Sequence, residues 1–233
     1  KMNPEQAFVQ ANSLLATAAR YAPANSEVMA VKGLHALVGD WDWSRAHEYS
    51  RQAAETGSST IPLAWYLSLV EARYAEAESV LDDVLQRDSA RLDPLLVKAA
   101  IARIQGDWNR SAEIYGAIEN SRLAWPDLLH HAESLFWIGS KADALAATRR
   151  VIEISERHPA ALIQMAALLG FSEQEEEGEK ILNEAQSAVT EASFFPSSAF
   201  AIAYLGLGDV SMALSSLESG FDEKGSWPML ELR

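Results

Sequence analysis

The sequence predicts an all-α protein made of about six repeated helix pairs stacked on one another. Three observations predict it: small residues recur at a nearly fixed interval, prolines recur at the same interval, and apolar residues follow at helical spacing. A single helix pair cannot bury its apolar face alone, so neighbouring pairs must stack. The whole chain, residues 1–233, is therefore expected to be one repeat domain.

The small residues follow one another at intervals of 31 to 35 residues. We expect each of them early in the second helix of a pair, where two helices cross closely and a larger side chain would force them apart. Apolar residues follow three and four positions apart, as in Tyr74, Ala77 and Leu81, which marks one helix face. These seven packing anchors are Ala11, Ala46, Ala77, Ser111, Ala144, Gly178 and Ala213.

Prolines recur at intervals of 32 to 37 residues, and each is expected to open the first helix of a pair, where its missing N–H costs nothing. Residues 4–21 are expected to form a second helix without its first, and residues 228–233 the start of another helix. The chain is therefore expected to be a fragment of a longer protein, with half repeats at both ends. The prolines are Pro62, Pro94, Pro126, Pro159, Pro196 and Pro228.

Three phrases mark the turn inside a pair: Gly39-Asp40-Trp41, Gly106-Asp107-Trp108 and Gly208-Asp209-Val210. In another pair Ala72 stands where a turn glycine is expected. The acidic run 173–179 is expected to open a second helix, with Ser172 and Glu175 forming a capping box. Acidic residues in a first turn also suit the helix dipole.

This period and pattern resemble the tetratricopeptide repeat, whose consensus has Gly and an aromatic residue near the turn, Ala early in the second helix and Pro at the link. The resemblance covers nearly the whole chain and implies a right-handed superhelical solenoid. Residues 39–46, and the last repeat from Phe195-Pro196 to Trp227, resemble more narrowly the C-terminal repeat tails of bacterial winged-helix transcription regulators and adenylate-cyclase-type signalling proteins. This narrower resemblance implies a sensory or interaction tail.

The family resemblance implies a concave groove lined by the first helices of the pairs. Arg103 is the one basic residue expected there, so the cluster of Lys and Arg that clamps a peptide carboxylate in chaperone-binding members is not expected. Phe136 and Trp137 either line the groove or pack against adjacent repeats. The expected groove residues are Tyr66, Leu69, Leu96, Arg103, Leu129, Glu133, Phe136, Trp137 and Ile163.

Composition and motifs argue against several classes of function. The 33 acidic and 19 basic residues give a net charge of −14, which repels a phosphate backbone, so no nucleic-acid binding is expected. No apolar run reaches the roughly 20 residues of a membrane span. The chain has no cysteine, and the adjacent His130 and His131 point about 100° apart on a helix, so no metal or cofactor is expected. The sequence contains neither a nucleophile motif nor a phosphate loop, so we expect no catalytic residue and no enzyme.

We therefore expect a non-catalytic module that binds a protein, a peptide or another domain of its parent chain, with a homodimer as a further option. A general assembly or chaperone-like scaffold is the alternative, and an enzyme with a site between repeats is the least favoured. The compartment stays open: the cytoplasm is favoured, and the periplasm follows if the parent protein has an upstream membrane span.

Overall fold

The computed structural model describes residues 4–56, 59–189 and 195–223. Within these ranges the chain forms thirteen α-helices and no strand, which confirms the predicted all-α fold. None of these helices is both long and apolar enough to cross a membrane. The chain divides into two compact units, residues 2–101 and residues 102–233, and each is described by itself. The single domain over 1–233 stays a prediction, and residues 228–233 lie outside the described ranges.

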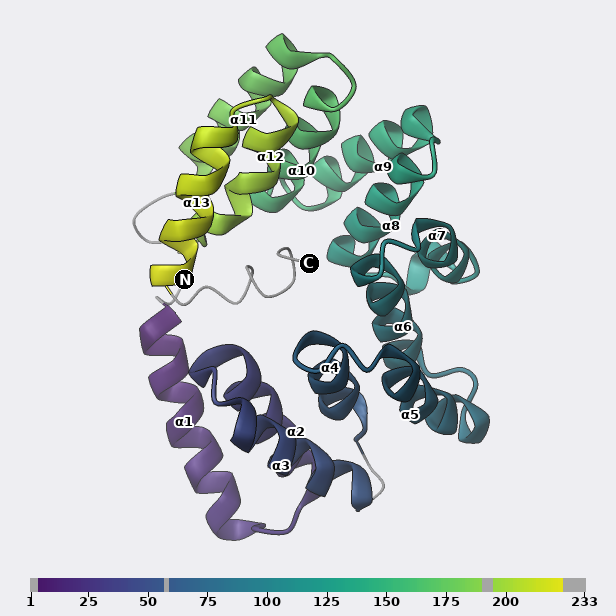
Figure 1. The fold of residues 1–233 in the computed structure, drawn as a ribbon, viewed down its shortest axis with the longest axis vertical. Helices are drawn as coiled ribbons and strands as arrows, with labels where there is room; N and C mark the ends of the chain where they lie inside the picture. The colour runs from purple at the N-terminus through teal and green to yellow at the C-terminus, as the bar shows by residue number, and fades with distance from the viewer. Residues whose placement is uncertain (1–3, 57–58, 190–194, 224–233) are drawn as a thin grey trace. The chain divides into compact units, whose positions relative to one another are not determined.

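The N-terminal unit begins with a lone helix over the residues expected for it and continues with helix pairs (Figure 1). One apolar cluster joins its last three helices and includes Ala64, Leu81 and Ile101. The Asp82–Lys98 ion pair also links the last two helices. The elements are α1 (Pro4–Tyr21), α2 (Ser26–His35), the π-helix η1 (Ala36–Asp40), α3 (Trp43–Glu55), α4 (Ile61–Leu69), α5 (Tyr74–Arg87) and α6 (Leu92–Ile104), which crosses the unit boundary.

In the unit of residues 102–233, the first helices of successive pairs pack side by side in the order α8, α10, α12. Its core centres on α10, where every residue from 161 to 170 except Gln164 is buried. The elements are α7 (Trp108–Gly116), η2 (Asn120–Arg122), α8 (Trp125–Trp137), α9 (Lys141–Ile154), α10 (Pro159–Gly170), α11 (Glu175–Ala188), η3 (Ser197–Phe200), α12 (Ala201–Gly206) and α13 (Val210–Asp222).

The turn inside each pair depends on one residue in the left-handed backbone region. Gly106, Gly139 and Gly208 hold this position with φ of 73°, 95° and 79°. The N–H of the next residue then donates to a carbonyl five residues earlier, as from Asp107 to Ala102 at 2.9 Å, which closes the first helix. The same Asp107 caps the second helix by accepting from the Arg110 N–H at 3.1 Å. The Gly-Asp phrase therefore ends one helix and starts the next.

The turn between α2 and α3 differs from the sequence expectation. Gly39 and Asp40 belong to the π-helix, and Trp41 takes the left-handed position with φ of 55°. Asp42 caps α3, and its N–H donates to the Ala36 carbonyl at 2.9 Å, six residues earlier. The structural equivalent of Gly106-Asp107-Trp108 is therefore Trp41-Asp42-Trp43, because the extra residue is absorbed by widening the last turn of the helix.

The packing anchors lie on the second helices, where the first helix crosses. Six of the seven are buried, and Ala11 on α1 is half-buried. At Gly178 an added Cβ would lie 3.1 Å from the Ala166 carbonyl oxygen on α10 and 2.8 Å from the Leu207 side chain, so even a methyl group would be a tight fit at this crossing. Ser111 is buried and shares a 2.9 Å hydrogen bond with Ser134 on α8, which satisfies the hydroxyl that replaces the usual alanine methyl.

The predicted prolines mark the helix starts correctly in most pairs, whereas the capping box predicted at Ser172 does not. Pro62, Pro126 and Pro159 lie at the first or second position of their helices, and Pro94 lies in the first turn of α6. Pro196 immediately precedes η3, and Pro228 lies outside the described ranges. The capping box at Ser172 is wrong: Glu173 is left-handed with φ of 60°, so α11 begins at Glu175 after Gln174. Its first turn is acidic, as predicted.

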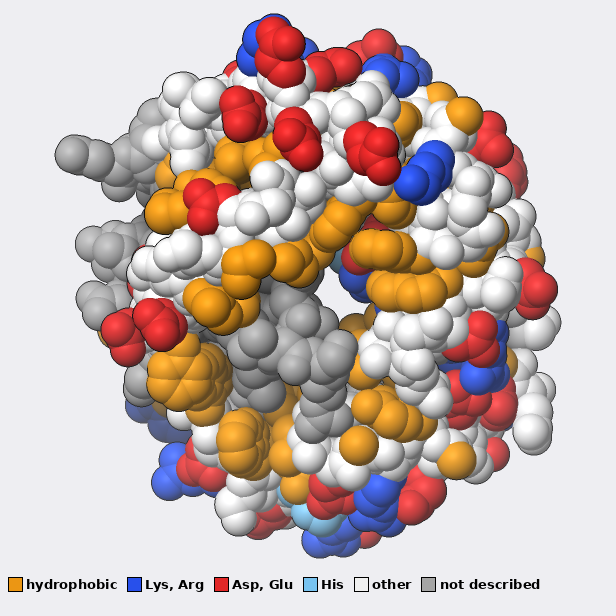
Figure 2. All heavy atoms as spheres, turned by 45° about the horizontal axis from the view of Figure 1, so that its top comes forward, with side chains coloured by type: hydrophobic (Ala, Val, Ile, Leu, Met, Phe, Trp, Pro, Cys, Tyr) orange, Lys and Arg blue, Asp and Glu red, His pale blue; other side chains and the backbone are white. Residues whose placement is uncertain are grey.

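The last described pair exposes apolar residues that earlier pairs bury. Counted from the turn glycine, Phe136 and Leu145 of α8 and α9 correspond to Leu205 and Leu214 of α12 and α13. The first two are 3% and 8% exposed, whereas the second two are 48% and 57% exposed. In Figure 2 hydrophobic side chains, in orange, gather in the region of this last pair. The comparison shows that burial at these positions comes from the following helix pair.

The turn at Ala72 gives a test of the left-handed position. Ala72 is exposed with φ of 54°, and a side chain there costs about 1 kcal/mol that glycine avoids. We expect Ala72→Gly to raise the free energy of unfolding by up to about 1 kcal/mol, measured by urea denaturation. The matched control is Gly106→Ala, whose Cβ would meet nothing within 4 Å, so its expected loss of similar size is conformational. Equal destabilisation by both changes would contradict the interpretation.

Candidate functional site

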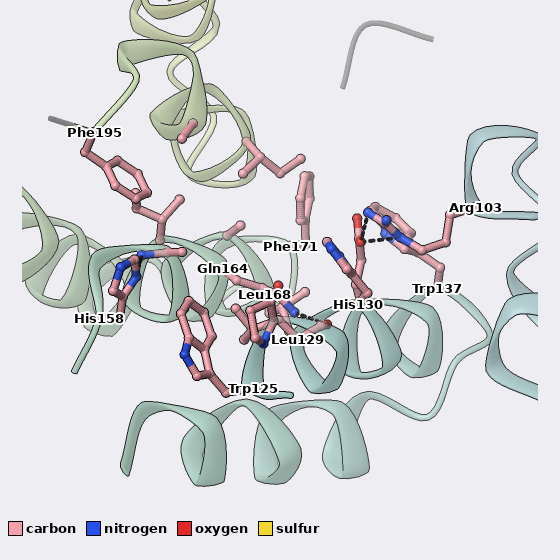
Figure 3. Close-up of a pocket in the computed structure, with 17 residues that line it drawn as sticks. Arg103, Trp125, Leu129, His130, Trp137, His158, Gln164, Leu168, Phe171 and Phe195 are labelled. Atoms are coloured by element: carbon pink, nitrogen blue, oxygen red, sulfur yellow. Dashed lines mark hydrogen bonds and ion pairs between the residues drawn. The ribbon is translucent and has the colours of Figure 1, made fainter. Parts of the chain in front are cut away.

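A pocket of about 220 Å³ opens between the first helices of the C-terminal unit (Figure 3). Residues at helical spacing on α8 form one wall, α10 forms the floor, and η3 and α12 close the far side. The lining residues come from α6 (Arg103), from α8 (Trp125, Pro126, Leu129, His130, Glu133 and Trp137), from α10 and its two ends (His158, Ala160, Ile163, Gln164, Ala167, Leu168 and Phe171), and from the last pair (Phe195, Ala199 and Ile202).

Aromatic rings stand at both ends of the pocket. At one end His158 lies 4.7 Å from Trp125 and 6.0 Å from Phe195, measured between ring centroids. At the other end Trp137 lies 5.3 Å from Phe171, with their rings tilted by 59°. The His158 Nδ1 accepts from the Ala160 N–H at 3.2 Å and caps α10, which fixes the orientation of that imidazole. Figure 3 shows the two groups on opposite sides of Leu129 and Leu168.

One ion pair lies at the Trp137 end of the pocket. The Arg103 Nε donates to Glu133 Oε2 at 2.9 Å, and Arg103 Nη2 lies 2.6 Å from the same oxygen. Their side chains are 18% and 21% exposed, so the pair is largely removed from solvent. Arg103 is thereby engaged by a carboxylate of the protein itself, which argues against its use as a clamp for a peptide carboxylate.

His130 lies beside this ion pair on the same face of α8 (Figure 3). Burial lowers the pKa of His130 well below its ordinary value, and the positive charge of Arg103 lowers it further. The imidazole is therefore neutral at pH 7, with one donor and one acceptor nitrogen. Among the described residues, no side chain or backbone group makes a hydrogen bond to its ring nitrogens. Gln164 differs, because its Nε2 donates to the Leu129 carbonyl at 2.7 Å.

Five of the expected groove residues line this pocket together: Arg103, Leu129, Glu133, Trp137 and Ile163. Phe136 belongs to the apolar core, where it meets Trp137 edge to face at 5.3 Å. Trp137 is 41% exposed and lines the pocket. The structure therefore places Phe136 in the core and Trp137 in the lining of the pocket.

The remaining expected groove residues lie in the N-terminal unit and do not line this pocket. Tyr66 and Leu69 are buried on α4, and Leu96 is half-buried on α6. The Tyr66 ring stacks on His47 at 4.8 Å, and its hydroxyl donates to Glu71 at 3.1 Å. These contacts give Tyr66 a packing role within its own unit.

Sequence reasoning missed several lining residues. Trp125 lies one helical turn before Leu129, so extending the stripe of Leu129, Glu133 and Trp137 backwards would have found it. His158 and Phe195 lie just before helices, at link positions that helical spacing does not describe. In the ranges that the structure describes, no three His, Asp or Glu residues are grouped so that they could hold a metal ion.

Comparison with known proteins places the fold. The chain is similar to the crystal structure of a tetratricopeptide repeat protein from Parabacteroides merdae ATCC 43184, with a TM-score of 0.61 and 15% identity over 91% of this chain and 78% of that one. The fold is that of a tetratricopeptide repeat protein. No protein-family model matches the sequence, and neither does any curated protein.

A second, weaker tetratricopeptide likeness is to YrrB, described as a TPR protein with an unusual peptide-binding site. It has 16% identity over 78% of this chain and 92% of that one, with a TM-score of 0.42. A likeness at this level does not transfer that binding site to this chain.

Stability should fall on acidification because His130 is held neutral in the folded protein. The unfolded chain binds a proton on this histidine near its ordinary pKa of about 6.5. Below that pH the unfolded state therefore binds more protons, and stability drops by at most about 1.4 kcal/mol per pH unit for this one group. Urea denaturation between pH 7.5 and 5 should show a steeper loss for the wild type than for His130→Gln. Parallel pH profiles for the two proteins would contradict this account.

Proposed function

We propose that this chain is a non-catalytic protein-interaction module that holds a bulky apolar side chain of a protein or peptide partner in the α8–α10 pocket. The observation that carries the proposal is the pocket itself, which is lined by apolar and aromatic side chains on the first helices of successive pairs. The tetratricopeptide fold supports it, because stacked helix pairs offer an extended rigid surface for a partner.

The size and lining of the pocket suit an anchor side chain rather than a large ligand. A dry apolar cavity of about 150 Å³ accommodates benzene, so about 220 Å³ accommodates one aromatic or branched aliphatic side chain. Burying such a side chain contributes about 1.5–3 kcal/mol. The rest of the affinity would come from partner backbone and flanking residues along the helices.

The biological setting that we propose is a bacterial signalling or transcription-regulatory protein, in which this module is the sensory tail. The support is the sequence resemblance of residues 39–46 and of the last repeat to such tails. A winged-helix or cyclase domain upstream in the parent gene would agree with this setting, whereas a parent made only of repeats would favour a general assembly scaffold. A homodimer through the groove is the further alternative, and sedimentation at several concentrations separates it from a monomer.

Panning a random peptide library on the whole chain tests the proposed function. We expect enriched peptides with a bulky apolar or aromatic residue, and calorimetry should show binding at least tenfold weaker for Trp137→Ala, a loss of about 1.4 kcal/mol. The matched control is Trp43→Ala, because Trp43 is 48% exposed, lies in the N-terminal unit and does not line the pocket.

Circular dichroism of each variant separates lost binding from lost folding. If both tryptophan variants keep their helicity and bind the selected peptides as the wild type does, the pocket is not the binding site. A loss of helicity in Trp137→Ala alone would instead assign Trp137 a packing role.

A further inference from the structure

We propose that the anchor held in the pocket is an uncharged aromatic side chain with a hydrogen-bonding group, a tyrosine, whose hydroxyl meets His130. This inference rests on the proposed function and names the chemistry of the partner. It follows from three properties of the Trp137 end of the pocket: its charges are already paired, one polar ring is left without a hydrogen bond among the described residues, and its walls are aromatic.

The pairing of Arg103 with Glu133 excludes a charged anchor. A partner carboxylate or phosphate would compete with Glu133 for the guanidinium and would leave a carboxylate buried without its ion pair. A partner ammonium would compete with Arg103 for the Glu133 carboxylate and would leave the guanidinium without its ion pair. Because the other walls of the pocket are mostly apolar, a third charge would lose its hydration without a counter-ion.

The imidazole of His130 supplies the polar contact. His130 lines the pocket, so a side chain bound there would displace any water that reaches its ring nitrogens. A purely apolar anchor would then leave a buried donor or acceptor unsatisfied, which costs binding free energy. A phenol hydroxyl both donates and accepts, so it matches a neutral imidazole in either tautomer.

The walls near His130 suit a ring. Figure 3 shows His130 on the same side of the pocket as Arg103 and Trp137. The rings of Trp137 and Phe171 are 5.3 Å apart and tilted by 59°, so they pack on each other, and the ring of an anchor would lie beside this aromatic pair rather than between its two rings. Leu129, Ile163 and Leu168 provide apolar contact for the remainder of the ring.

Short capped peptides of sequence Lys-Gly-X-Gly-Lys test this inference on the whole chain. Their lysines follow from the net charge of −14, which favours association with a basic peptide. The position X is tyrosine, phenylalanine, leucine or phosphotyrosine. Binding is followed by NMR through the indole N–H signals of Trp125 and Trp137, which Trp→Phe variants assign. We expect the tyrosine peptide to bind about fivefold tighter than the phenylalanine peptide and at least tenfold tighter than the phosphotyrosine peptide.

Substitution of the histidine supplies the second half of the test. In His130→Phe, or in His130→Leu if the first variant does not fold, the ratio of tyrosine to phenylalanine affinity should fall to about one. The matched control is His131→Phe, since His131 is the next residue of α8, stacks on Tyr115 and does not line the pocket. This control should keep the fivefold ratio.

The outcomes separate this inference from the proposed function. Equal binding of the tyrosine, phenylalanine and leucine peptides at the Trp137 signal would overturn the role of His130 and leave an apolar interaction pocket. Tighter binding of phosphotyrosine would overturn it as well, because Arg103 would then exchange Glu133 for an anion. If neither these peptides nor any peptide selected from the library shifted the indole signals, the proposed function would fail together with this inference.

Discussion

The close crossing of two helices at a small residue is the contact on which the rest of the structure depends. At Gly178 a methyl group would lie only 3.1 Å from the backbone of α10, and Ala77 and Ala144 have no exposed surface at all. Because each second helix lies this near its first helix on one side, the opposite side of the first helix is left for other contacts. On α8 and α10 that opposite side lines the pocket. The pocket therefore lies on the side of the first helices that the anchors leave uncovered.

Two glycines extend the same constraint from one pair to the next. An added Cβ at Gly170 would lie 2.5 Å from the backbone of Gly206, and one at Gly206 would lie 2.6 Å from the Ala167 carbonyl oxygen. The contact between α10 and α12 is thus made by backbone rather than by long side chains. A close backbone contact leaves the two helices little freedom to shift against each other. Ala199 and Ile202 are thereby fixed opposite α10, where they close the far side of the pocket.

The fold could be predicted from the sequence because its signals are local and repeated. The spacing of small residues and prolines predicts helix pairs, and the described helices agree with it from α2 to α13. The two predictions that were wrong concern single positions, where several neighbouring residues could each end or begin a helix. Trp41, not Gly39, takes the left-handed position, and Gln174, not Ser172, precedes α11, and no local residue pattern separates the two candidates in either case.

The site could be predicted only in part, for a related reason. Helical spacing along α8 found Leu129, Glu133 and Trp137, which share one face of one helix. It gave no information on His158 and Phe195, whose positions depend on how the links before α10 and η3 run. Arg103 and Glu133 are 30 positions apart in the sequence, so their ion pair could not be predicted from local spacing. The sequence indicated only that Arg103 is the one basic residue among the expected groove residues.

The turns of this chain close in two lengths, and this bears on how such arrays change during evolution. The hydrogen bond that closes the turn spans five residues from Ser140 to Leu135 but six from Arg73 to Leu67, at 2.9 Å and 2.8 Å. A turn of this kind therefore closes the first helix by a hydrogen bond with either number of residues. Copies of a duplicated helix pair can in this way differ by one residue in the turn between their two helices. The two closures differ by one residue, so most of the spread of 31 to 35 residues between anchors arises in the helices and links outside these turns.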